Sequence, residues 1–162
     1  MIEGDSPTAR LCAAGMEVDG DPGAAHALFE QAWHARRDAY EAAIAAHFLS
    51  RHQPSAELKL HWNRVALEEA LTLSPSRAEA LLPSLYLNLG DSYLNIGKPR
   101  EAEQAATLGL AALTHLPPDG YSAFVMSGLE RLRSRIAELG LRGTRLTKEL
   151  QFPDDAFGGG GR

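Results

Sequence analysis

Apolar residues recur every three or four positions along most of the chain, which predicts amphipathic helices. The clearest case is residues 82–115, which read as two helices joined by a tight break. One face of the first helix carries its apolar and small residues: Leu85, Leu89, Ser92, Tyr93 and Ile96. Gly97-Lys98-Pro99 then ends it, because glycine suits a left-handed C-cap and proline suits the next first turn. One side of the second helix is small: Ala102, Ala105, Ala106 and Gly109. The pattern therefore predicts an antiparallel helix hairpin.

This hairpin resembles the tetratricopeptide repeat, a helix–turn–helix unit of about 34 residues. Three residues match the motif of that family at its spacing: Leu89, Gly90 and Tyr93. Tyr86 stands where the family often has tryptophan. In the second helix Ala102 matches a small position, whereas Ala106 replaces the usual aromatic residue and Gly109 replaces alanine. The resemblance implies a right-handed stack of such hairpins.

A second copy of the pattern begins at the break Gly20-Asp21-Pro22 and continues with Ala25, Phe29 and Ala32. A degenerate copy lies between the two breaks, and His47 there takes the place that Gly90 has 43 residues later. We therefore expect repeats over about 6–38, 39–74 and 82–115. The additional residues near 74–82 predict a break just before Pro83.

Helix-capping residues mark several expected boundaries. Ser6-Pro7 predicts a helix start, Asp38 followed by Glu41 forms a capping box, and Ser55 opens the next helix. A final helix over 120–139 is expected to end at Gly140 and to cap the array, because repeat arrays need a terminal helix with one polar face. Residues 141–152 are expected to form a short helical extension, with a flexible stretch over 1–5 and a disordered glycine-rich tail over 153–162.

The predicted fold is thus all-α, a short right-handed solenoid of about three tetratricopeptide-like hairpins with a C-terminal capping helix. Abundant alanine and few β-branched residues agree with helix. A net charge of −5 gives no general attraction to nucleic acid or to an anionic membrane, and no apolar run is long enough to span a bilayer. The single cysteine, Cys12, fits a reducing cytoplasm.

Motifs for catalysis, phosphate binding or metal binding are missing from the sequence. His47 and His52 are five residues apart, so they do not share a helix face as a metal-binding pair would. An acid–base site formed by Glu41, Asp91 and His47 stays an alternative. We nevertheless expect no enzyme activity, no metal and no cofactor.

In the tetratricopeptide family the first helices of the hairpins line a concave groove. The resemblance therefore implies that a protein or peptide partner is bound there, by Glu41, Ile44, Phe48, Arg51, His52, Asn88 and Asp91. The family's clamp for a C-terminal carboxylate is not expected, because its lysines are missing; the chain holds only Lys59, Lys98 and Lys148.

A second interpretation is a small-molecule pocket, catalytic or not, around a cluster of unusual side chains in and beside the middle copy. Its members are Trp33, His47, Trp62 and Asn63. A third is self-association as a homodimer through an exposed face. Residues 20–140 also look like small bacterial repeat proteins without an assigned activity, a resemblance that implies a fold and not a reaction.

Overall fold

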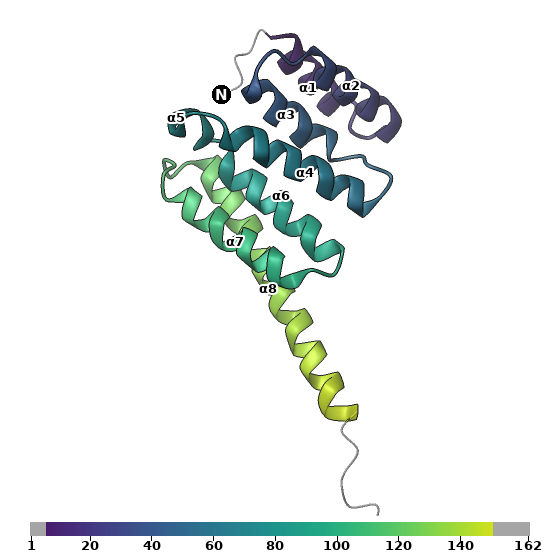
Figure 1. Ribbon diagram of the computed structural model, residues 1–162, viewed down its shortest axis with the longest axis vertical. Helices are drawn as coiled ribbons and strands as arrows, with labels where there is room; N and C mark the ends of the chain where they lie inside the picture. The colour runs from purple at the N-terminus through teal and green to yellow at the C-terminus, as the bar shows by residue number, and fades with distance from the viewer. Residues whose placement is uncertain (1–5, 151–162) are drawn as a thin grey trace, which may run out of the picture.

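The chain forms helices that lie side by side in a stack, with the last one extending away from the others (Figure 1). This arrangement comes from a computed structural model that describes the backbone of residues 6–150 and the side chains of residues 6–140. Its helices are α1 (Pro7–Glu17), α2 (Pro22–Ala35), α3 (Ala39–Leu49), α4 (Ala56–Leu71), α5 (Pro75–Ala78), α6 (Leu82–Asn95), α7 (Pro99–Leu113) and α8 (Gly120–Leu150). The described residues contain no strand, so the prediction of an all-α fold is confirmed.

Helices that follow one another in the chain are also neighbours in space. Three pairs form hairpins: α1 with α2, α3 with α4, and α6 with α7. The hairpins stack through α2 against α3 and through α4 against α6, and α8 then covers α6 and α7. None of the described helices combines the length and the apolar character needed to cross a bilayer.

The starts of α1, α3 and α4 are fixed by side chains next to them in the sequence. The Ser6 hydroxyl accepts a hydrogen bond from the Ala9 N–H at 3.0 Å, and the Ser55 hydroxyl caps α4 in the same way at 3.2 Å. Asp38 accepts from the Glu41 N–H at 2.8 Å. Each cap satisfies a backbone donor that the first turn of a helix leaves unpaired.

Two of the breaks also form where the sequence indicated. Gly97 has a φ of +75°, the left-handed conformation that ends α6, and it is the only residue with positive φ among those described. Pro83 lies in the first turn of α6, where its missing N–H costs no helical hydrogen bond. The intervening α5 is a single turn that leads the chain from α4 to α6.

The final helix is longer than the sequence analysis expected. It continues through Gly140 to Leu150, so the expected end at residue 139 is wrong. Residues 141–150 are helical, as the expected extension requires, but they continue α8 without a break. Gly140 keeps a helical backbone, since it does not have the positive φ of a cap. No proline occurs between Pro118 and Pro153, so nothing in that stretch forces the helix to stop. The expectations for residues 1–5 and 153–162 concern residues outside those described.

One face of α8 closes the open end of the α6–α7 hairpin. Val125, Leu129 and Leu132 are buried against it, in a cluster with Ala102 and Ala106 of α7. The outer positions, among them Glu130, Arg133 and Ser134, are exposed. The helix thus has the apolar inner side and polar outer side that a terminal helix needs.

Candidate binding groove

A small cavity lies between α3 and the start of α6, two helices that both pack on α4. Its volume is about 130 Å³. The lining is apolar except for one imidazole and one hydroxyl: Ala43, Ile44, His47, Phe48, Leu81, Ser84 and Leu85. Ile44 and Phe48, predicted for the groove, and His47, predicted for the alternative pocket, line the same space here.

A chain of hydrogen bonds connects the helices behind this cavity. The Asn88 side-chain amide of α6 lies 3.0 Å from Nδ1 of His47 on α3. Asn63 of α4, which is 1% exposed, donates to the Ser92 hydroxyl at 2.8 Å and to the Asn88 carbonyl at 3.4 Å. Buried polar groups joined in this way favour one relative placement of their helices. The network therefore holds α3, α4 and α6 in register.

The contact with Asn88 indicates which tautomer His47 adopts. An amide nitrogen can only donate, so Nδ1 of the imidazole accepts and the ring proton is on Nε2. Burial, and to a smaller extent the positive charge of Arg51, lowers the pKa of His47 from 6.5 to about 4. At neutral pH the ring is therefore uncharged, with an N–H donor on the side opposite Asn88.

Two residues predicted for the groove line the cavity directly, and a third supports it. Ile44 and Phe48 form part of the α3 wall, and the Phe48 ring also stacks on Phe29 with centroids 5.5 Å apart. Asn88 does not line the cavity but orients His47, which does.

Glu41 lies within the packing between α1 and α3 and is buried. Its carboxylate accepts hydrogen bonds from the Arg37 guanidinium and backbone and from the Thr8 hydroxyl. The hydrogen bonds to Arg37 lower the pKa of Glu41 from 4.5 to about 2, against the opposing effect of burial. Through these hydrogen bonds the Glu41 side chain holds α1 on α3. Glu41 does not line the cavity.

Arg51 and His52 meet Asp19 at the turn between α1 and α2. Arg51 Nη2 lies 2.6 Å from one carboxylate oxygen and His52 Nε2 lies 2.7 Å from the other. These contacts hold the turn of the first hairpin to the turn of the second, and they lower the pKa of Asp19 to about 2. Both side chains are thus placed at the hairpin turns and outside the lining of the cavity.

Asp91 connects α6 to its neighbours. Its carboxylate pairs with Arg135 of α8, lies 3.8 Å from Lys59 Nζ of α4, and accepts from Asn95 one turn later. The carboxylate is therefore shared among three helices.

The residues of the predicted small-molecule pocket do not line one common cavity. Trp33 and Trp62 pack edge to face with ring centroids 5.0 Å apart, and Arg36 lies over the Trp33 ring. Asn63 belongs to the buried hydrogen-bond network. Of the four, His47 alone is in the cavity lining.

The α6 wall of the cavity, formed by Leu81, Ser84 and Leu85, is not predicted by the sequence pattern. The apolar period places Leu85 on the core face of its helix, and residues 74–82 are additional to the repeat. Nothing in the spacing indicated that this addition carries the start of α6 opposite the end of α3.

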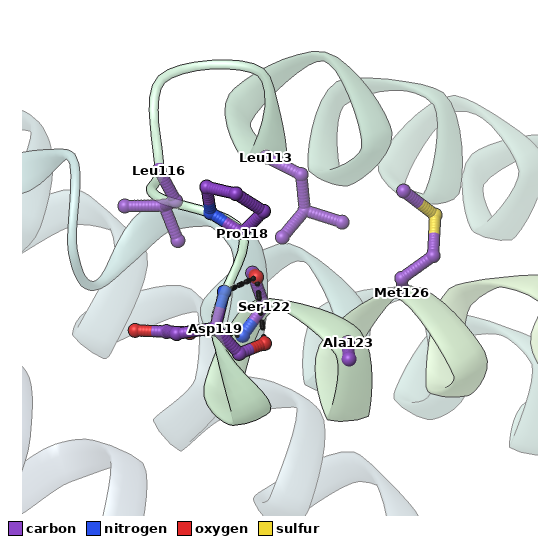
Figure 2. Close-up of a pocket in the computed structure, with 7 residues that line it drawn as sticks. All are labelled: Leu113, Leu116, Pro118, Asp119, Ser122, Ala123 and Met126. Carbon is purple, nitrogen blue, oxygen red and sulfur yellow. Dashed lines mark hydrogen bonds between the residues drawn. The ribbon is translucent and has the colours of Figure 1, made fainter.

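A second, larger cavity of about 350 Å³ lies at the corner between α7 and α8 (Figure 2). Leu113, Pro118 and Met126 surround it, and Asp119 and Ser122 form its polar edge. The Asp119 N–H donates to the Ser122 hydroxyl and the Ser122 N–H donates to the Asp119 carboxylate, so these groups cap the start of α8. The wall of this second cavity is therefore apolar, and the polar groups of Asp119 and Ser122 at its edge are already hydrogen-bonded in the cap of α8.

Within residues 6–140, no three histidine, cysteine, aspartate or glutamate side chains lie close enough together to hold a metal ion. Comparison of the chain with protein-family models, with curated proteins and with solved structures finds no match.

The ion pair of Glu41 gives a pH dependence that tests its structural role. Because its pKa is lower in the folded state, its contribution to stability is present above pH 4.5 and is lost as the pH falls toward 2. We expect Glu41→Gln to lower the free energy of unfolding at pH 7 by about 2–3 kcal/mol, the scale that the lowered pKa and the charged hydrogen bonds imply. The difference from the parent protein should shrink between pH 4.5 and 2, which urea unfolding at several pH values would measure. A difference that stays constant with pH would contradict this role.

Proposed function

We propose that the protein is a tetratricopeptide-like adaptor that binds a peptide segment of a partner protein, without catalysis, in the groove between α3 and α6. These are the first helices of the second and third hairpins, which is the position that lines the concave face in that family. The observation that carries the proposal is the apolar cavity between them, with His47 in its wall. The motif residues Leu89 and Gly90 lie buried in the third hairpin, as the resemblance implies.

The size of the cavity favours a peptide over a small molecule. Sites that enclose a cofactor or a drug-sized ligand have volumes of about 300–1,000 Å³. The cavity between α3 and α6 has about 130 Å³, which suits one side chain of a longer segment. The larger hollow at α7 and α8 is within that range, but its polar groups cap a helix.

The surroundings of His47 favour binding over acid–base chemistry. A catalytic histidine usually has a carboxylate at its second nitrogen, to orient the ring and to stabilise the imidazolium. Here the partner of His47 is the Asn88 amide. Glu41 is bonded to Arg37, and Asp91 is paired with Arg135, so neither carboxylate contacts the imidazole.

The buried free thiol of Cys12 and the net charge of −5 support two further parts of the proposal. One is a cytoplasmic location, where thiols stay reduced. The other is a partner that is a protein and not nucleic acid or a membrane.

Selection from a phage-displayed library of random 12-residue peptides tests the proposed site. Ser84 lines the cavity and is half-buried, so in Ser84→Trp the indole would occupy the cavity. We expect peptides selected on the parent protein to bind Ser84→Trp at least tenfold more weakly, as measured by fluorescence polarisation.

Thr107→Trp is the matched control, because Thr107 is exposed on α7 and away from the cavity. It should bind the selected peptides as the parent protein does. Equal binding by Ser84→Trp and the parent protein would place the peptide elsewhere and would refute the proposed groove.

A further inference from the structure

Resting on this proposed function, we infer that the groove recognises an aliphatic side chain, of the size of leucine or methionine, together with a neighbouring carbonyl oxygen. The side chain enters the cavity between α3 and α6, and the carbonyl accepts a hydrogen bond from Nε2–H of His47. His47 is then the residue that positions the partner's backbone.

The cavity walls exclude a charged anchor. Ile44, Phe48 and Leu85 present apolar surface, and the Ser84 hydroxyl donates to the Leu81 carbonyl at 3.1 Å. The imidazole is uncharged at neutral pH because of its surroundings. A buried charge without a partner is costly, so a lysine or glutamate side chain has no place here.

The volume separates aliphatic from aromatic anchors. An apolar cavity of about 150 Å³ holds a benzene molecule. Phenylalanine adds a methylene group to that ring, and the cavity here is smaller, at about 130 Å³. The unbranched methionine and the compact leucine side chains therefore fit better than an aromatic ring.

The hydrogen-bond network leaves one donor for the partner. Asn88 uses Nδ1 of His47, and Asn88 is itself connected through its backbone carbonyl to the buried Asn63. Among the described residues none accepts a hydrogen bond from His47 Nε2. A peptide that fills the cavity brings carbonyl oxygens next to its anchor, which are the acceptors that this N–H lacks.

The probe for the test is N-acetyl-leucine N-methylamide, which carries one aliphatic side chain between two carbonyl groups. Titrated into the ¹⁵N-labelled protein at millimolar concentration, it should shift the backbone amide signals of α3 and α6 and the Nε2 signal of His47. The phenylalanine and lysine analogues of the probe should bind at least fivefold more weakly. Equal binding by the three probes would overturn the inference.

Two variants separate the hydrogen bond from the cavity. His47→Phe keeps an apolar ring but removes the donor, so the leucine probe should bind about fivefold more weakly. His47→Gln retains an N–H donor and should recover part of that loss. If His47→Phe does not fold, hydrogen exchange in the parent protein provides the test. The Hε2 proton of His47 should exchange with water more slowly when the probe is bound. Unchanged exchange would refute the hydrogen bond.

The inference and the proposed function fail in different ways. Peptides that depend on Ser84 but bind His47→Phe as tightly as the parent would overturn the role of His47 and leave the groove as the site. Selected peptides that bind Ser84→Trp as tightly as the parent would overturn the proposed function.

Discussion

Phe29→Ala is expected to lower the free energy of unfolding by about 4 kcal/mol, the cost of removing a large aromatic side chain from a filled core. Phe29 is completely buried, packs with Ala25 and Leu49, and stacks on Phe48. Its loss would leave a cavity where the first hairpin meets the second. For a protein of this size the melting temperature should fall by about 10 °C. Urea unfolding followed by circular dichroism at 222 nm would measure the change.

Phe124→Ala provides the matched control, because Phe124 is 70% exposed on α8. The same substitution there should change the free energy of unfolding by less than about 0.5 kcal/mol. A similar loss of stability in both variants would mean that the first and second hairpins do not pack around Phe29 as described.

Gly90→Val is expected to destabilise the protein by about 3 kcal/mol through overpacking. A Cβ atom at this position would lie 2.6 Å from a Leu132 methyl carbon, 3.2 Å from the Ala102 carbonyl oxygen and 3.4 Å from the Ala105 Cβ. Glycine therefore allows α6 to approach both α7 and α8. Because a neighbouring atom is backbone, the clash cannot be relieved by a side-chain rotation alone. Thermal unfolding of the variant would measure the effect.

Gly140→Ala is the opposite case and serves as its control. Among the described residues, no heavy atom other than those of adjacent residues and its own helix backbone lies within 4 Å of a Cβ placed there, and the residue is inside α8. Since alanine is a better helix former, this variant should be as stable as the parent or more stable by up to about 1 kcal/mol. A destabilised Gly140→Ala would show that residue 140 is not in a regular helix.

The features that the sequence predicted well are local ones. A serine or aspartate before a helix bonds to a backbone N–H three residues later, as Ser6, Asp38 and Ser55 do, so its effect is visible in a few adjacent letters. Gly97 followed by Pro99 is equally local. The apolar period similarly placed Leu85 and Leu89 on one buried face.

Gly140 shows the limit of such local signals. A glycine near the end of an apolar pattern fits a cap, but it also fits a helix interior at a cost of about 1 kcal/mol. The choice depends on the backbone that follows. Here the helix continues, and the sequence carries no proline nearby to stop it.

Only some residues predicted for the groove line the cavity, because the polar ones among them pair with residues far away in the sequence. Asp19 meets Arg51 across 32 residues, and Arg135 meets Asp91 across 44. Helical periodicity gives the face on which a side chain lies, but it does not give the residue on the next element. An apolar member such as Ile44 lines a cavity whose other wall comes from the start of α6.

The order in which the helices pack has a consequence for how the chain acquires its structure. The main contacts join helices that are adjacent or nearly adjacent in the chain, so each closes a short loop. Short loops cost little chain entropy, and proteins rich in such contacts fold in microseconds to milliseconds. A hairpin such as α1–α2 is complete as soon as Ala35, its last residue, has left the ribosome. The described helices can therefore form in chain order during synthesis, with each new hairpin packing on the one before it.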